Sequence, residues 1–221
     1  MKKIMLLAIL LFLEGLQAGD KAQFLSLGFS PDGKYFAFSQ YGIQDGSGFP
    51  YADIYIVNVE KNTYVAGGVY KNKFDSIVDP RTEGLHVLLE LRIQADSLFR
   101  LLQIESQKQG ITLYQNKMRE SINISWTNNK DKLYKASLEQ ISKTYNEIGV
   151  QSAFHLILEQ SNSTILTIGD KQRFRPYVRR YDIDRVITNH EQTSYVFVIQ
   201  MTRMGFEGPD IRYMVETVRL P

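Results

Sequence analysis

The 221-residue sequence contains no cysteine and only three histidines. The absence of cysteine excludes disulfide bonds, thiol catalysis, zinc–thiolate sites and a lipid anchor attached to an N-terminal cysteine. The histidines are His86, His155 and His190, and no two of them have the spacing of metal ligands. The sequence therefore predicts neither a metal site nor a cofactor.

A strong excess of one charge is also missing. Lysine and arginine number 26 against 24 aspartates and glutamates, which gives a formal net charge of +2. A balance this close to neutral predicts no general attraction to nucleic acid or to an anionic membrane surface. We therefore expect no nucleic-acid partner.

No apolar run reaches the length of a membrane-spanning helix, which is about 20 residues. The longest run covers residues 4–13, follows two lysines and ends before a Glu-Gly pair. This arrangement, with Ala18 at a suitable cleavage position, is typical of a secretory signal peptide. We expect residues 1–18 to be removed and residues 19–221 to form a single globular domain, periplasmic or secreted, with no transmembrane segment.

Most of the remaining chain has the pattern of short β-strands. Residues 29–38 indicate a turn and then an aromatic strand, since Gly33 tolerates the positive φ of a tight turn. A β-branched segment at residues 53–59 completes a hairpin with a long loop. Residues 136–148 also fit a helical period, but a strand is favoured because residues 146–149 resemble a hairpin connection.

Helical periodicity is strong in one segment only, residues 81–104. Asp79 suits the N-cap and Pro80 the first helical position. The apolar side chains that then fall on one face are Val87, Leu88, Leu91, Ala95, Leu98, Phe99 and Leu102. We expect one long amphipathic helix packed across a sheet. The predicted fold class is α+β, mainly antiparallel β, as a sandwich or a curved sheet.

The two ends of the chain resemble each other. Residues 195–200 repeat the pattern of residues 35–40, and the loop at residues 205–210 resembles residues 48–50 together with Asp53. Aromatic hairpins with Gly-Pro loops look alike for physical reasons alone, and an internal duplication explains the likeness equally well. Both explanations stay open.

Distinctive motifs occur near both ends of the chain. They are GFS at residues 28–30, DGKYFAF at residues 32–38, YGIQDGSGFPYA at residues 41–52 and GFEGPDIRYMV at residues 205–215. On these motifs the chain resembles a bacterial family of predicted secreted proteins, a domain-of-unknown-function family. The resemblance implies export and no particular activity. Residues 29–57 also resemble one blade of the periplasmic propeller repeats of TolB-like proteins.

The most unusual features are two loops, at residues 45–51 and 205–210. Each places a phenylalanine among glycine, proline and acidic residues. Burial at the end of a sheet is the simpler explanation of these phenylalanines. Their shared form nevertheless makes the loops the best candidate for a recognition surface. The candidate binding residues are Asp45, Ser47, Phe49, Tyr51, Phe206, Glu207 and Asp210.

Motifs for catalysis are weak. The sequence has no Gly-x-Ser-x-Gly elbow, and residues 45–48 lack the ligands of a calcium loop and the Gly-Lys ending of a phosphate loop. Asp182 and Asp184 have the spacing to share a strand face, but neighbouring arginines favour ion pairs. The basic and aromatic residues 171–185 fit an anionic polymer or a sugar, although a solvated, self-compensated strand face is the simpler interpretation.

We therefore expect an exported, non-catalytic binding or assembly protein, with another envelope protein as its partner. The alternative is a hydrolase that acts on an envelope polymer through Asp182, Asp184 or Glu207. The two hypotheses predict different geometries. An enzyme should have a cleft with converging carboxylates, and a binding protein should have the two loops side by side.

Overall fold

The computed structural model describes residues 19–73, 83–117, 121–147, 149–161, 163–206 and 208–220. The expected signal peptide at residues 1–18, the expected helix start at Asp79 and Pro80, and the candidate Glu207 lie outside this part of the chain. None of the helices in the described part is long and apolar enough to cross a membrane.

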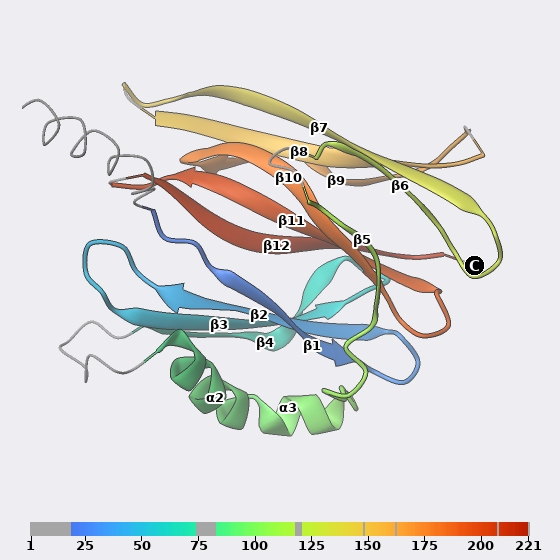
Figure 1. The fold of residues 1–221 in the computed structure, drawn as a ribbon, viewed down its shortest axis with the longest axis horizontal. Coiled ribbons are helices and arrows are strands. Elements are labelled where there is room, and N and C mark those ends of the chain that lie inside the picture. Colours follow the sequence, from blue (N-terminus) through green and yellow to red (C-terminus); the bar gives the residue numbers. More distant parts are fainter. Residues whose placement is uncertain are drawn as a thin grey trace, which may run out of the picture.

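The described strands form three antiparallel sheets of four strands each (Figure 1). The first sheet has the order β1 (Gln23–Phe29), β2 (Tyr35–Ile43), β3 (Pro50–Asn58), β4 (Thr63–Lys73). The central sheet has the order β12 (Pro209–Arg219), β11 (Ser194–Met204), β10 (Val178–Thr188), β5 (Ile111–Gln115). The third sheet has the order β6 (Asn123–Thr127), β7 (Leu133–Tyr145), β8 (Gly149–Gln160), β9 (Ser163–Pro176). The prediction of a mainly antiparallel β fold is confirmed.

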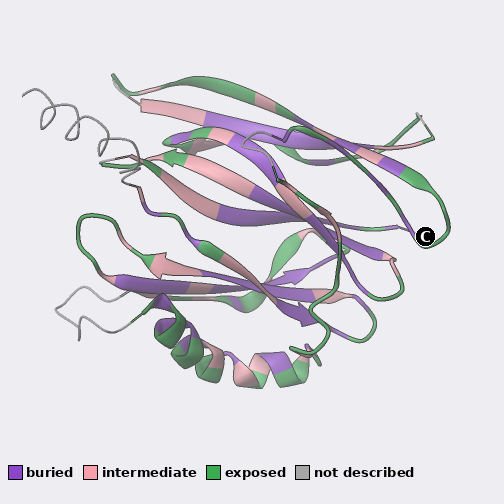
Figure 2. Cartoon of the chain, in the orientation of Figure 1, coloured by how far each residue is buried: buried purple, intermediate pink, exposed green. Residues whose placement is uncertain are grey.

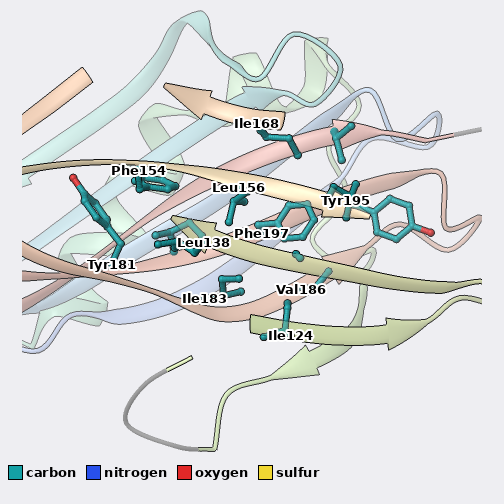
Figure 3. Close-up of a cluster of buried hydrophobic side chains, with 14 of the residues drawn as sticks. Ile124, Leu138, Phe154, Leu156, Ile168, Tyr181, Ile183, Val186, Tyr195 and Phe197 are labelled. Atoms are coloured by element: carbon teal, nitrogen blue, oxygen red, sulfur yellow. The ribbon is translucent and has the colours of Figure 1, made fainter. Parts of the chain in front are cut away.

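The central sheet lies between the other two, and both of its faces are buried (Figures 1 and 2). In β11, Tyr195, Phe197 and Ile199 pack in the cluster shared with the third sheet, part of which Figure 3 draws. Val196 and Val198 pack in the cluster shared with the first sheet. Because successive side chains of a strand point to opposite faces, one run of apolar residues fills both layers.

The first sheet is covered on both faces as well. Phe36 and Phe38 of β2 pack toward the central sheet, whereas Ala37 belongs to the cluster under the helices. Helices α2 (Gly84–Gln94) and α3 (Asp96–Leu101) lie on this outer face (Figure 1). The molecule therefore stacks a helical layer and three sheets.

The prediction of one long amphipathic helix over residues 81–104 is wrong. The structure has two short helices in this region, separated at Ala95. The Leu98 N–H donates to the Ala95 carbonyl at 3.1 Å, and this i to i+3 bond tightens the backbone between the helices. Periodicity does not reveal the break, because the buried Leu91, Ala95 and Phe99 keep a regular spacing across it.

Helix α2 is also less amphipathic than its sequence suggests. One face packs on the first sheet, but the apolar Leu85, Leu89 and Ile93 are exposed, with Ile93 77% exposed. Apolar residues on both sides weaken the contrast that defines an amphipathic helix. The apolar pattern therefore identifies a helix here without defining its buried face.

The strand interpretation of the ambiguous segment is confirmed, since residues 136–145 lie in β7 and residues 146 and 147 form a turn. The sequence pattern did not predict β4 and β5. Strand β4 contains Gly67 and Gly68, a pair typical of turns. Gly67 has a φ of +69°, and the pairing of β3 with β4 shifts register at this point. A glycine bulge thus interrupts the pattern without ending the strand.

Gly28 is the backbone position where the fold tolerates a side chain least. Its φ is +118°, and a Cβ there would lie 2.1 Å from the carbonyl oxygen of Glu105. We expect Gly28→Ala to lower the free energy of unfolding by about 3 kcal/mol, through backbone strain and displacement of the segment at Glu105. Urea denaturation measures this loss.

Gly46 provides the matched control for this substitution. It also has a positive φ, +78°, but no atom lies within 4 Å of the position of an added Cβ. Gly46→Ala is therefore expected to cost about 1 kcal/mol, from the backbone conformation alone. Equal losses in the two variants would show that the contact with Glu105 has no energetic role.

Candidate functional site

The two candidate loops lie at the same end of two hairpins that pack against each other. The hairpin β2–β3 and the hairpin β11–β12 share one hydrophobic cluster, in which Phe38 and Tyr55 meet Val198 and Tyr213. The loop at residues 44–49 joins the first pair of strands, and the chain at residues 205–208 joins the second. Packing of the hairpins therefore brings the loops together.

The loops line a common hollow of about 270 Å³. We call the residues that line it the loop surface: Asp20, Gln44, Asp45, Gly46, Ser47, Phe206, Asp210 and Arg212. Four predicted binding residues are among them, namely Asp45, Ser47, Phe206 and Asp210. The two loops therefore lie side by side.

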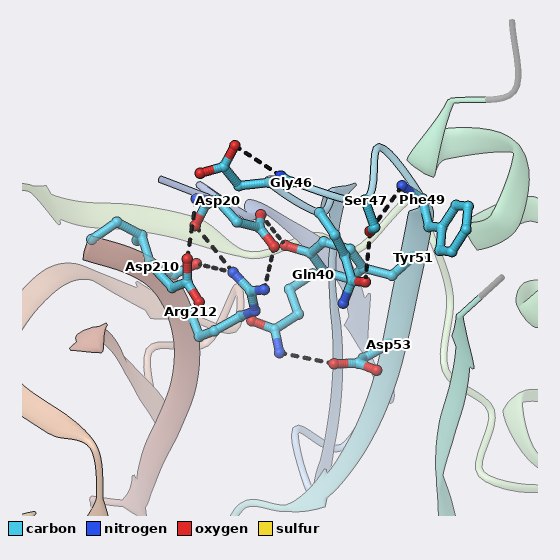
Figure 4. Close-up of polar contacts among 12 residues, drawn as sticks. Asp20, Gln40, Gly46, Ser47, Phe49, Tyr51, Asp53, Asp210 and Arg212 are labelled. Carbon is cyan, nitrogen blue, oxygen red and sulfur yellow. Dashed lines mark hydrogen bonds and ion pairs between the residues drawn. The ribbon is translucent and has the colours of Figure 1, made fainter. Parts of the chain in front are cut away.

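The two loop phenylalanines have different environments. The side chain of Phe206 is 99% exposed, so burial at the end of the sheet does not explain it. Phe49 is half-buried and does not line the hollow. Figure 4 shows its ring pointing away from Asp20 and Arg212. The loop surface thus presents one phenylalanine, and the expected pairing with Phe49 is not found.

Tyr51 lies beneath the loop surface, where it is 5% exposed. Its hydroxyl donates to Asp20 Oδ1 at 2.9 Å, and the guanidinium of Arg212 lies over its ring at 4.7 Å from the centroid. Burial raises the pKa of the Tyr51 hydroxyl well above its ordinary value. Tyr51 is therefore a neutral positioning residue, which a partner cannot reach directly.

Arg212 and Asp20 form the anchor of the site (Figure 4). The Arg212 guanidinium pairs with the Asp20 carboxylate and also donates to the Asp20 carbonyl at 3.1 Å. The Asp20 N–H donates to Asp210 Oδ1 at 3.2 Å. These bonds fix the segment at Asp20 to the start of β12, which carries the second loop.

The first loop is held by its own hydrogen bonds. The Gly46 N–H donates to Asp45 Oδ1 at 3.0 Å, and the Phe49 N–H donates to Ser47 Oγ at 3.3 Å. The Ser47 hydroxyl in turn donates to the side chain of Gln44 at 3.2 Å. Asp45 and Ser47 therefore shape the loop, and both remain exposed to a partner.

Sequence reasoning missed Asp20 and Arg212. Arg212 leaves a signal in retrospect, because it is the charged residue in the otherwise apolar and aromatic segment at residues 211–215. A charge in such a strand requires a partner. The partner is distant in sequence, since Asp20 lies near the opposite end of the chain, and no local pattern identifies it.

Two of the three candidate catalytic carboxylates, Asp182 and Asp184, lie in the described part of the chain, and both form ion pairs. Asp182 is 1% exposed and pairs with Arg180 at 2.8 Å, and its other oxygen accepts the Ser121 N–H. Asp184 pairs with Arg185 at 2.6 Å. The ion pairs expected from the neighbouring arginines are thus present.

The described residues contain no group of three or more side chains that could hold a metal ion. His155 is 6% exposed and lies 3.2 Å from Glu139 across the third sheet, whereas His86 accepts the Glu83 N–H at the start of α2. Both histidines thus have structural partners.

A family model described as Predicted secreted protein (DUF2259) matches residues 37–219. The matched region contains both loops of the loop surface and both hairpins, apart from the first two residues of β2. No curated protein and no solved structure matches the chain.

Proposed function

Because the chain belongs to a family of predicted secreted proteins, we propose that it works outside the cytoplasm as a non-catalytic binding protein. In this proposal the loop surface binds another envelope protein, in the periplasm or on the cell exterior. Phe206 makes the central contact, and Asp45 and Asp210 form a polar rim around it.

The exposure of Phe206 carries this proposal. Its side chain is 99% exposed, whereas large aromatic side chains elsewhere in the molecule are mostly buried. Phenylalanine is enriched at protein interfaces, where burial of an aromatic ring contributes much of the binding energy. A fully exposed ring beside a hollow is thus suited to insertion into a partner.

The rigid base of the loop surface supports the same proposal. The ion pair of Arg212 with Asp20 and the hydrogen bond from Tyr51 hold both loops before any partner arrives. A preorganised surface loses less conformational entropy on binding. Both loops are therefore fixed in position before binding, as in a preorganised binding site.

Copurification tests the proposal. Tagged wild-type protein from the envelope fraction is expected to recover a partner, and Phe206→Ala is expected to recover at least about tenfold less of it, as for an interface hot spot. Ile165→Ala is the matched control, because Ile165 is 43% exposed on β9 and does not line the hollow. An identical set of recovered proteins from wild type and Phe206→Ala would refute the role of Phe206.

A further inference from the structure

A second and larger cleft lies between β3 and β4 of the first sheet, β11 and β12 of the central sheet, and β9 of the third sheet. Its volume is about 700 Å³, within the range of small-molecule binding sites. It shares only Arg212 with the loop surface, so the two sites are distinct.

Basic side chains dominate the cleft. Five of them form no ion pair with any described residue: Lys61, Lys71, Arg173, Arg175 and Arg203. They come from the turn before β4, from β4 itself, from β9 and from β11. A sixth, Arg212, is committed to Asp20. The cleft thus gathers more cations, from all three sheets, than it has acidic side chains to offset them.

The acidic residues of the cleft already have hydrogen-bond donors. Asp53 Oδ2 accepts the Gln40 side-chain amide and the Tyr55 hydroxyl, both at 3.0 Å. Asp170 Oδ1 accepts the Gln172 N–H at 2.7 Å. Glu216 accepts the side-chain amide of Asn62. These hydrogen bonds leave the three negative charges in place, and the six basic side chains of the lining still outnumber the three acids.

Glu216 is the most deeply buried acid of the cleft, at 6% exposure. Burial raises the pKa of its carboxyl above the ordinary value, although Asn62 and the nearby Arg173 and Arg175 act in the opposite direction. Arg173 and Arg175 therefore lie close enough to Glu216 to act on it as positive charges.

Aromatic and amide groups complete the lining. Tyr55 and Tyr64 lie with their ring centroids 5.3 Å apart, and Tyr64 is 47% exposed. The amides of Gln40 and Asn62 line the same cleft, where they donate to Asp53 and Glu216 and hold these carboxylates in place. The exposed ring of Tyr64 offers an apolar surface to a ligand. Charge alone would not require this ring.

We propose that this cleft binds an acidic oligosaccharide. The cations pair with carboxylate or sulfate groups spaced along the chain, and the exposed ring of Tyr64 contacts a sugar face. Cations spread over several strands fit charges distributed along an oligomer better than they fit one compact phosphate. Only part of the basic segment at residues 171–185 therefore contributes to this site. Arg173 and Arg175 line the cleft, whereas Arg180 and Arg185 form ion pairs with aspartates.

Isothermal titration calorimetry tests the site with a hexamer of galacturonic acid as the probe. Wild-type protein is expected to bind one hexamer per chain, and neutral maltohexaose and inorganic phosphate are expected to bind at least about tenfold more weakly. If maltohexaose bound as tightly as the acidic hexamer, charge would not determine binding. If phosphate bound as tightly as the acidic hexamer, the sugar would not contribute to binding. Either result, or no binding of the acidic hexamer, overturns the proposal.

Charge variants locate the site. The double variant Arg173→Gln/Arg203→Gln removes two exposed cations that have no ion partner among the described residues, and it is expected to weaken binding at least about tenfold. Glu216→Gln removes a negative charge and is expected to strengthen binding, up to about fivefold. Arg100→Gln, whose side chain is 82% exposed on α3, is the control and should bind as wild type.

The two charge variants distinguish binding in the cleft from binding elsewhere. Opposite effects of the arginine and glutamate substitutions support the cleft as the site. Unchanged affinity in Arg173→Gln/Arg203→Gln, with folding verified by circular dichroism, would place the hexamer elsewhere and overturn the assignment. Copurification through Phe206 is a separate experiment, so this proposal and the loop-surface proposal fail independently.

Discussion

Arg212→Met is expected to lower the free energy of unfolding by about 3–5 kcal/mol. The side chains of Arg212 and Asp20 are 15% and 4% exposed, so loss of the guanidinium leaves a carboxylate buried without its counter-charge. The hydroxyl of Tyr51 still donates to Asp20 and compensates only in part. Urea denaturation of wild type and variant, fitted with one common slope, measures the difference.

Two further variants test whether the unpaired carboxylate of Asp20 causes the loss of stability. Arg219→Met removes an exposed arginine that donates to the Asp32 carbonyl at 3.1 Å, and its expected cost is below about 1 kcal/mol. Asp20→Asn combined with Arg212→Met should recover part of the loss, because no unpaired charge remains buried. An Arg212→Met variant as stable as Arg219→Met would mean that the ion pair does not anchor the site.

Phe197→Ala is expected to lower the free energy of unfolding by about 4 kcal/mol. Phe197 is fully buried in the central sheet and meets Trp126 of the third sheet edge-on, with ring centroids 5.7 Å apart. Truncation of this side chain leaves a cavity between two sheets that the surrounding strands cannot fill. The same denaturation experiment measures the loss, with Trp126 as the fluorescent probe.

Phe206→Ala is the matched control, because it makes the same chemical change at a 99% exposed position. Its expected cost is within about 0.5 kcal/mol of zero. This control also supports the copurification experiment. If the Phe206→Ala variant is as stable as wild type, a loss of the partner results from the missing ring on the loop surface and not from unfolding. Comparable losses at Phe197 and Phe206 would contradict the burial of one and the exposure of the other.

Local patterns predicted β2, β3 and β11 well, because these strands are rich in apolar and aromatic side chains that are buried on both faces. The aromatic hairpin before Asn58 and the apolar run at residues 195–199 are both strands in the structure. The sequence singled out the two loops, but their meeting depends on the packing of the two hairpins, which no local pattern contains. The resemblance of the first strands to a propeller blade stays a prediction.

Features set by distant contacts could not be predicted. The break at Ala95 is absent from the helical pattern because both helices bury residues on the same sheet. The pairing of Asp20 with Arg212 joins opposite ends of the chain, and the basic cleft combines residues from three sheets. Composition and spacing contain no information about which of these distant side chains meet.

Site-specific crosslinking tests the central claim, that the two loops form one binding surface, most directly. A photoreactive amino acid replaces Asp45, Phe206 or Ile165 in turn, and irradiated envelope fractions are probed for adducts of the protein. Positions 45 and 206 line one hollow and are expected to give the same adduct, whereas position 165 should give none. Different adducts at positions 45 and 206, or none at either, would contradict a shared surface.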